Sequence, residues 1–214
     1  MAYQFTAASS QYLSCPTTSA NVPLTIACWV YPTILGIATT QFYVEFGPTS
    51  SPTNRFGIGN ANNSSAFRVT VANNTTNAQA NTTALLSLNN WNHVAGVFSS
   101  SASRTAYLNG GNAVTNTTSL AINASNTVRI AAAQGATTIS NYANGHITDV
   151  GVWNAALTQA EVVSLAKGMT CNKVRPQNLV FYAPLIRDLQ DVKGGLSITN
   201  NNGATVANHP RIYA

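Results

Sequence analysis

Short runs of alternating hydrophobic and polar residues, separated by turn residues, recur along the chain. In residues 24–30 both sets of alternate positions are largely apolar, which predicts a central strand covered on both faces. Residues 42–46 and 67–71 alternate cleanly instead, which predicts strands with one face in solvent. Further strand-like runs are found at 91–98, 105–108, 128–130, 146–153, 179–182 and 196–199. Many short strands with regular turn signals are typical of an antiparallel sandwich or barrel.

Turn and cap residues predict a hairpin and one helix. Asn109-Gly110 indicates a tight type I′ turn, because both residues tolerate a positive φ. Thr158 and Glu161 have the spacing of a capping box, in which each side chain accepts a hydrogen bond from the other residue's backbone amide. We therefore expect a short helix at about residues 158–167. The stretch 73–81, rich in Asn, Thr and Ala, predicts a long loop instead.

The chain is unusually poor in charge. Charged residues make up 7% of its 214 residues, against roughly 25% in ordinary soluble domains. A surface with so few charges favours an assembly or an extracellular setting over free life in the cytosol. Residues 1–166 carry four arginines against three acidic residues, whereas residues 167–214 carry six cations against two acidic residues. These spaced cations are typical of a solvated or docking face. The sequence has no basic stripe interleaved with aromatic residues, so we expect no nucleic-acid partner.

Length and cysteine usage narrow the organisation further. A chain of this length buries about 70% of the surface that it exposes when unfolded, so we expect residues 1–214 to form a single domain. Cys15, Cys28 and Cys171 have no metal-binding spacing. Buried free thiols are favoured, and a Cys15–Cys28 bridge stays open as the alternative. We expect neither a signal peptide nor a membrane partner, since no basic leader and no long apolar run occurs.

Several of these runs also carry family motifs, in the family's order. LTIACWV at 24–30 is similar to an early f-t-i-s-a-W-v strand, WNHVA at 91–95 to a W-h-h-v-a strand, and YLNG at 107–110 to an l-Y-v-N-G hairpin. Residues 144–161 are similar to a final strand that runs into a short helix. Together they resemble the laminin-G-like jelly rolls of the concanavalin A-like lectin and glucanase superfamily. The resemblance implies an all-β, two-sheet antiparallel jelly-roll sandwich with one short helix.

One motif stands in an unexpected place. FYAPL at 181–185, with Asp188, is similar to the y-y-P-L-d-g segment that often opens such domains, but here it follows the helix. This order suggests a circularly permuted jelly roll, in which the C-terminal segment 169–214 returns to the sandwich beside the first strand and ends in a basic tail. Permuted domains with such tails resemble those of tailed-phage virion proteins. The resemblance implies a virion location, with a coat or tail protein or further copies of the chain as partners.

The sequence contains no motif for catalysis, cofactor binding or metal binding. A retaining glycosidase needs two carboxylates about 5–5.5 Å apart, and the E-x-D-x-E strand of the glucanases is absent. Calcium takes about six to eight oxygen ligands, whereas the chain has five acidic residues in all. Neither a nucleophile elbow nor a phosphate-binding glycine motif occurs. We therefore expect no enzyme activity and no cofactor.

The sequence offers three sets of candidate residues. The strand motifs predict a structural core that includes Trp29, Trp91, Asp149 and Trp153. Tyrosines expected near loops are candidates for glycan contact: Tyr31, Tyr43 and Tyr142. Cations in the C-terminal segment predict a docking face for a partner: Arg175, Arg187, Lys193 and Arg211. The favoured function is a non-catalytic structural or decoration protein of a phage particle, and the alternative is a carbohydrate-binding module for cell-surface glycans.

Overall fold

The computed structural model describes residues 1–48, 54–73, 76–135 and 138–208. One α-helix, α1 (Gln159–Ala166), and two short 3-10 turns, Ala7–Ser9 and Cys171–Lys173, accompany the strands of these ranges. In chain order the strands are β1 (Ala2–Phe5), β2 (Tyr12–Ala20), β3 (Leu24–Pro32), β4 (Phe42–Gly47), β5 (Arg55–Asn60), β6 (Ala66–Ala72), β7 (Asn77–Leu85), β8 (Asn92–Ser100), β9 (Ser103–Leu108), β10 (Gly111–Asn116), β11 (Ser125–Ile130), β12 (Ala133–Gln134), β13 (Ile139–Ser140), β14 (Gly145–Trp153), β15 (Leu179–Ala183), β16 (Thr199–Asn201) and β17 (Thr205–Ala207).

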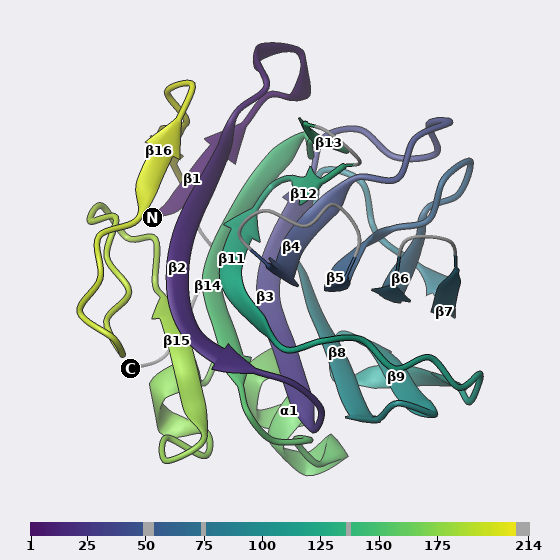
Figure 1. The fold of residues 1–214 in the computed structure, drawn as a ribbon. Helices are drawn as coiled ribbons and strands as arrows, with labels where there is room; N and C mark the ends of the chain where they lie inside the picture. The colour runs from purple at the N-terminus through teal and green to yellow at the C-terminus, as the bar shows by residue number, and fades with distance from the viewer. Residues whose placement is uncertain (49–53, 74–75, 136–137, 209–214) are drawn as a thin grey trace.

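Most of these strands form two antiparallel sheets that face each other (Figure 1). Sheet A has the order β10-β9-β8-β3-β14-β1-β17, and β15 also pairs with β14. Sheet B has the order β16-β2-β11-β4-β5-β6-β7, while β12 and β13 form a separate small hairpin. This arrangement confirms the predicted all-β jelly-roll sandwich with one short helix.

The main core lies between the inner faces of the two sheets. Alternation along β5 and β6 turns Phe56, Ile58 and Val69 inward, and the Phe56 ring meets the edge of Phe98 from sheet A with 5.0 Å between ring centroids. Each large apolar side chain buried in this way contributes about 1.5–3 kcal/mol. The clean alternation predicted for residues 67–71 is therefore the pattern of a sheet with one face in the core.

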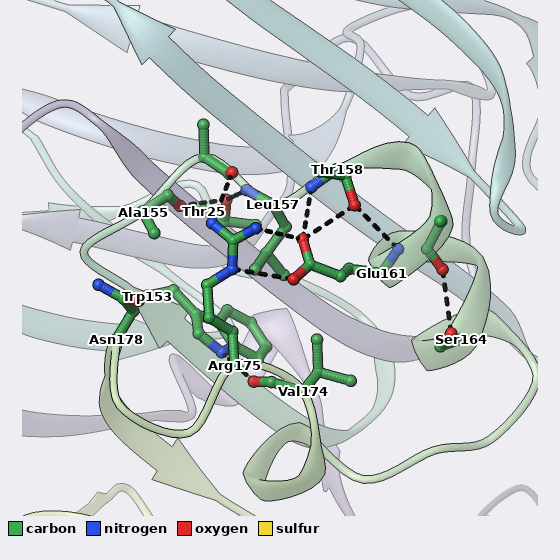
Figure 2. A network of polar contacts seen from close by, with 12 residues as sticks. Thr25, Trp153, Ala155, Leu157, Thr158, Glu161, Ser164, Val174, Arg175 and Asn178 are labelled. Atoms are coloured by element: carbon green, nitrogen blue, oxygen red, sulfur yellow. Dashed lines mark hydrogen bonds and ion pairs between the residues drawn. The ribbon is translucent and has the colours of Figure 1, made fainter.

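A second core cluster covers part of the outer face of sheet A. Helix α1 places Val162 and Leu165 against Trp153, which is fully buried at 0% exposure. Figure 2 shows the polar frame of this cluster, in which the Trp153 indole Nε1 donates to the Val174 carbonyl oxygen at 2.8 Å. The predicted capping box is present, because Thr158 and Glu161 each accept from the other's backbone amide. Strand β3 is consequently covered on both faces along its first half, as its apolar pattern predicts.

Strand β14 joins segments from both ends of the chain. Strand β1 pairs with its first half, as Tyr3 lies opposite Ile147, and β15 pairs with its second half, as Ala183 lies opposite Val150. Both strands run antiparallel to β14, so β15 and β1 follow one another in the same direction along one side of it. Strand β17 then pairs with β1, and β16 with β2. A circularly permuted jelly roll has this geometry, with the late segment preceding the first strand in space.

The loop predicted for residues 73–81 is largely a strand. Residues 77–81 of the stretch predicted as a loop begin strand β7, which pairs with β6 along its length. Ala78 and Ala80 point into the core, while Asn77 and Gln79 point outward. Small alanines supply little hydrophobic contrast against Asn and Thr, so the alternation of this strand is weak in the sequence.

The three cysteines are free and buried, and no bridge joins Cys15 to Cys28. Burial raises the pKa of the Cys15 thiol to about 11, and it raises the pKa of Cys28 and Cys171 well above the ordinary value. The fold is therefore stabilised by packing rather than by disulfides.

We predict that Trp153→Ala lowers the free energy of unfolding by about 3–5 kcal/mol, because it empties the centre of the second core cluster. Urea unfolding followed by circular dichroism measures this change. Reductant serves as the control, since the wild-type melting temperature should stay the same with and without dithiothreitol. A large drop in melting temperature on reduction, together with a small effect of Trp153→Ala, would show that disulfides stabilise the fold more than this packing does.

Candidate functional site

The outer face of sheet B holds a groove of about 430 Å³ over strands β4 to β7. Two glycines on β5 let Phe42 and Gln41 lie close against that strand, because a Cβ at position 57 would overlap the Phe42 ring and a Cβ at position 59 would overlap the Gln41 carbonyl oxygen. The groove is lined mainly by small and uncharged polar side chains together with two arginines: Ala38, Thr39, Thr40, Phe42, Arg55, Asn62, Arg68, Thr70, Asn77, Gln79 and Asn141.

Arg68 is held by three uncharged side chains. Its Nε donates to Asn81 Oδ1 at 3.0 Å, its Nη1 to Thr40 Oγ1 at 3.1 Å and its Nη2 to Asn62 Oδ1 at 3.0 Å. Desolvation by burial lowers the pKa of Arg68, but a guanidinium stays protonated at neutral pH. The contacts fix the side chain without neutralising its charge.

Arg55 extends along the same groove. Its guanidinium carbon lies 5.2 Å from the centroid of the Phe42 ring, a cation–π distance, and its Nη1 donates to the Gln134 carbonyl oxygen at 2.8 Å. Burial lowers the pKa of Arg55, and the Coulombic attraction of Glu45 opposes that shift. The Phe42 ring itself is only 4% exposed, so it supports Arg55 and offers little open surface for stacking.

The acidic residue nearest the groove already has a partner. Glu45 Oε2 accepts from Arg129 Nη1 at 2.9 Å and from the Gln134 backbone amide at 3.0 Å. Burial raises the pKa of Glu45, while Arg129 is the largest influence that lowers it. None of the chain's other four acidic residues lines the groove. Among the described residues, the outer face of sheet B thus carries three arginines, Arg55, Arg68 and Arg129, and one carboxylate, Glu45.

The tyrosines proposed for glycan contact lie in three different environments. Tyr43 is 1% exposed and belongs to the core between the sheets, so it cannot contact a ligand. The reason is a β-bulge between Phe42 and Val44, which breaks the alternation and turns Tyr43 inward. Tyr142 lies near Tyr12 with 6.1 Å between ring centroids, and its hydroxyl donates to the Ile139 carbonyl oxygen at 3.1 Å.

Tyr31 belongs to an aromatic stripe on the outer face of sheet A. Its ring stacks on that of His146 with centroids 5.1 Å apart, and it meets Trp91 edge-on at 5.5 Å. Trp29 meets His93 at 5.4 Å in the same stripe. Trp29 and Trp91 are partly exposed and lie outside both core clusters, which differs from the core placement expected for them. Helix α1 covers only the part of this face around Trp153.

Asp149, which was also expected in the core, is buried at 3% exposure. It lies where the register of β14 against β3 shifts, and its backbone φ is 51°. Its Oδ2 accepts from the Cys171 thiol at 3.5 Å. Burial raises the pKa of Asp149 to about 6.

The cations proposed for docking do not all remain available. Arg175 binds Glu161 through Nε at 2.8 Å and Nη2 at 2.9 Å, so it completes the helix cap seen in Figure 2. Lys193 Nζ donates to the Pro176 carbonyl oxygen at 3.2 Å, and Arg187 is exposed. Arg211 lies outside the described residues. The sequence alone could not reveal that Arg175 has an intramolecular partner, because Glu161 is fourteen positions away.

Other kinds of site find no support in the described ranges. No group of three or more His, Cys, Asp or Glu side chains gathers there to hold a metal ion. No helix there is both long enough and apolar enough to cross a membrane. No carboxylate lines the groove, so the groove lacks the acid pair of a glycosidase.

The two-sheet sandwich is a jelly roll of the concanavalin A-like lectin type. Residues 7–163 match the laminin G model described as the concanavalin A-like lectin/glucanases superfamily, and the chain belongs to this family. No curated protein matches the sequence.

Solved structures with the same fold include several carbohydrate-binding domains. A heptameric SAP-like pentraxin from Limulus polyphemus aligns with a TM-score of 0.63 and 19% identity over 91% of this chain and 87% of its own. A putative carbohydrate-binding protein from Bacteroides ovatus aligns with a TM-score of 0.66 and 17% identity, over 95% of this chain and 58% of its own. The CBM40 module of a Ruminococcus gnavus sialidase, bound to α2,3-sialyllactose, aligns with a TM-score of 0.51 and 12% identity, over 72% of this chain and 97% of its own. At these identities the likeness shows the fold alone.

We predict that His93 destabilises the fold in acid. Burial lowers the pKa of His93 to about 3 from the ordinary 6.5. Below pH 6.5, His93 is therefore protonated in the unfolded chain but stays neutral in the folded chain. Stability contributed by neutral His93 is therefore lost progressively as the pH falls from about 6.5 toward 3. As the pH falls over this range, the free energy of unfolding should decrease less in His93→Gln than in the wild type. Urea titrations at several pH values measure this difference. Parallel pH profiles for the two proteins would contradict the assignment.

Proposed function

We propose that this chain is a carbohydrate-binding module and that the groove on sheet B holds the glycan. The observation that carries the proposal is the polar lining of the groove over strands β4 to β7. Hydroxyl, amide and guanidinium groups of Thr40, Asn62, Arg68, Asn77 and Gln79 face it. Such groups donate and accept the hydrogen bonds that neighbouring sugar hydroxyls require.

The groove has the size and rigidity that ligand sites need. Its volume of about 430 Å³ falls within the roughly 300–1,000 Å³ of small-molecule sites. Six of its lining side chains project from paired strands of sheet B, so binding orders little of their backbone and the entropic cost there is small: Phe42, Arg55, Arg68, Thr70, Asn77 and Gln79. Because Phe42 is covered, recognition depends on hydrogen bonds and charge rather than on stacking against an open ring.

The family supports this proposal at the level of fold. Among structures of the same fold, one from Bacteroides ovatus is described as a putative carbohydrate-binding protein and one from Ruminococcus gnavus contains a bound sialylated sugar. Those descriptions concern the neighbours, and they make a glycan the first ligand class to test on this chain.

Gln79→Ala should weaken glycan binding about tenfold, because it removes hydrogen bonds worth about 1–1.5 kcal/mol from the groove. A glycan array first identifies a bound oligosaccharide, and titration calorimetry then gives the dissociation constants. Gln4→Ala is the matched control, since Gln4 is exposed on β1 of sheet A. Equal losses in both variants would move the site away from the groove, and a wholly blank array would refute the glycan proposal.

A second proposal concerns where the module works. We propose that it is carried on a phage particle, as a non-catalytic structural or decoration protein attached to a coat or tail protein or to copies of itself. The low charge of the chain favours this setting, and exposed Arg187 remains available to an acidic partner surface. The two roles are compatible, because a decoration module can also bind sugars.

If the chain is a virion component, it should remain with particles purified on a density gradient and be identified there by mass spectrometry. Raising the salt concentration should release an Arg187→Glu, Lys193→Glu variant before the wild-type chain, because ion pairs at the surface are screened. Finding the chain only in the particle-free fraction would contradict a virion location.

A further inference from the structure

We infer that the groove selects acidic glycans, with the carboxylate of a sugar residue bound by Arg68 and attracted by Arg55. This inference rests on the proposed glycan-binding function and adds a ligand class to it.

The first argument is the charge of the groove. Both of its arginines contact uncharged acceptors: the side chains of Asn81, Thr40 and Asn62 for Arg68, and the Gln134 carbonyl for Arg55. Glu45 is close enough to influence Arg55, but its carboxylate is bound by Arg129. The described face therefore has an excess of two positive charges, which only a ligand or solvent ions can balance.

The second argument is the orientation of Arg68. A guanidinium has five N–H groups, and the three hydrogen bonds use one on Nε and one on each terminal nitrogen. One N–H on Nη1 and one on Nη2 therefore stay without a partner among the described residues. A carboxylate can accept charge-assisted hydrogen bonds from these free donors. Because three neighbours already hold the guanidinium, a ligand need not order it, and the entropic cost of binding is small.

The third argument is the combination of charge with neutral polar groups. Thr70, Asn77 and Gln79 line the same groove as the two arginines, within reach of one small ligand. A simple inorganic anion would leave these groups solvated and would gain nothing from them. A sugar that carries a carboxylate beside hydroxyl groups can use both kinds of contact, so it fits the groove better than a neutral sugar or a small anion.

The test compares ligands that differ only in charge. Titration calorimetry at low salt measures 3′-sialyllactose against the methyl ester of its sialic acid carboxylate, and oligogalacturonate against its methyl ester. We expect at least one acidic ligand to bind about tenfold or more tightly than its neutral partner, with an advantage that shrinks as salt is raised. Sulfated oligosaccharides without a carboxylate form a separate arm, and tighter binding of these would overturn the carboxylate assignment.

Arg68→Gln should lower the affinity for the acidic ligand far more than the affinity for the neutral one, so that the preference for the acidic ligand is lost. Arg187→Gln is the matched control, because it removes an exposed arginine outside the groove. Circular dichroism checks folding, and Arg68→Lys, which keeps the charge but loses the planar guanidinium, should retain only part of the preference.

The outcomes separate the two proposals. Equal binding of acidic and neutral sugars, both weakened by Gln79→Ala, would overturn the charge selection and leave the glycan function standing. Failure of every sugar to bind would overturn both. A preference for acidic sugars that survives Arg68→Gln would place the selecting charge elsewhere and overturn the role given to Arg68.

Discussion

The burial of strand β14 on both faces is the constraint on which the rest of the structure depends. Its inner face packs against sheet B through Ile147, Val150 and Val152, and its outer face ends at Trp153 beneath helix α1. Along its edges it pairs with β3 on one side and with β1 and β15 on the other. A single strand thus links the sandwich core, the helix and segments from both ends of the chain. The capping box and the Arg175–Glu161 pair hold the helix over this strand.

The fold could be predicted from the sequence because its signals are local. Alternation in 67–71, the Asn109-Gly110 turn and the Thr158–Glu161 spacing each depend on a few neighbouring residues, and each is present in the structure. Strand β7 was missed for the same reason, since its local contrast is weak. Nothing local indicates the bulge that turns Tyr43 into the core, because a bulge is defined by the partner strand.

The candidate site could not be predicted in the same way. In the sequence, Arg68 is only a polar residue on the solvent-facing side of a predicted strand. Its three hydrogen-bond partners come from other segments of the chain. The pairing of Glu45 with Arg129 spans 84 positions, and it decides which arginines keep an unbalanced charge. Long-range pairing of this kind depends on strand order and register, so charge counts along the sequence pointed instead to the C-terminal segment.

The alternation of β5 and β6 separates two kinds of selection pressure. Inward positions such as Phe56 and Val69 determine folding stability, whereas outward positions such as Arg55 and Arg68 face the groove. Substitutions at outward positions can therefore change what is bound without opening a cavity in the core. Gly57 and Gly59 are the exceptions, since a side chain at either position would overlap the Phe42 ring or the Gln41 carbonyl oxygen. Among related chains, recognition can thus diverge quickly at the outward arginines while these glycines and the core evolve slowly.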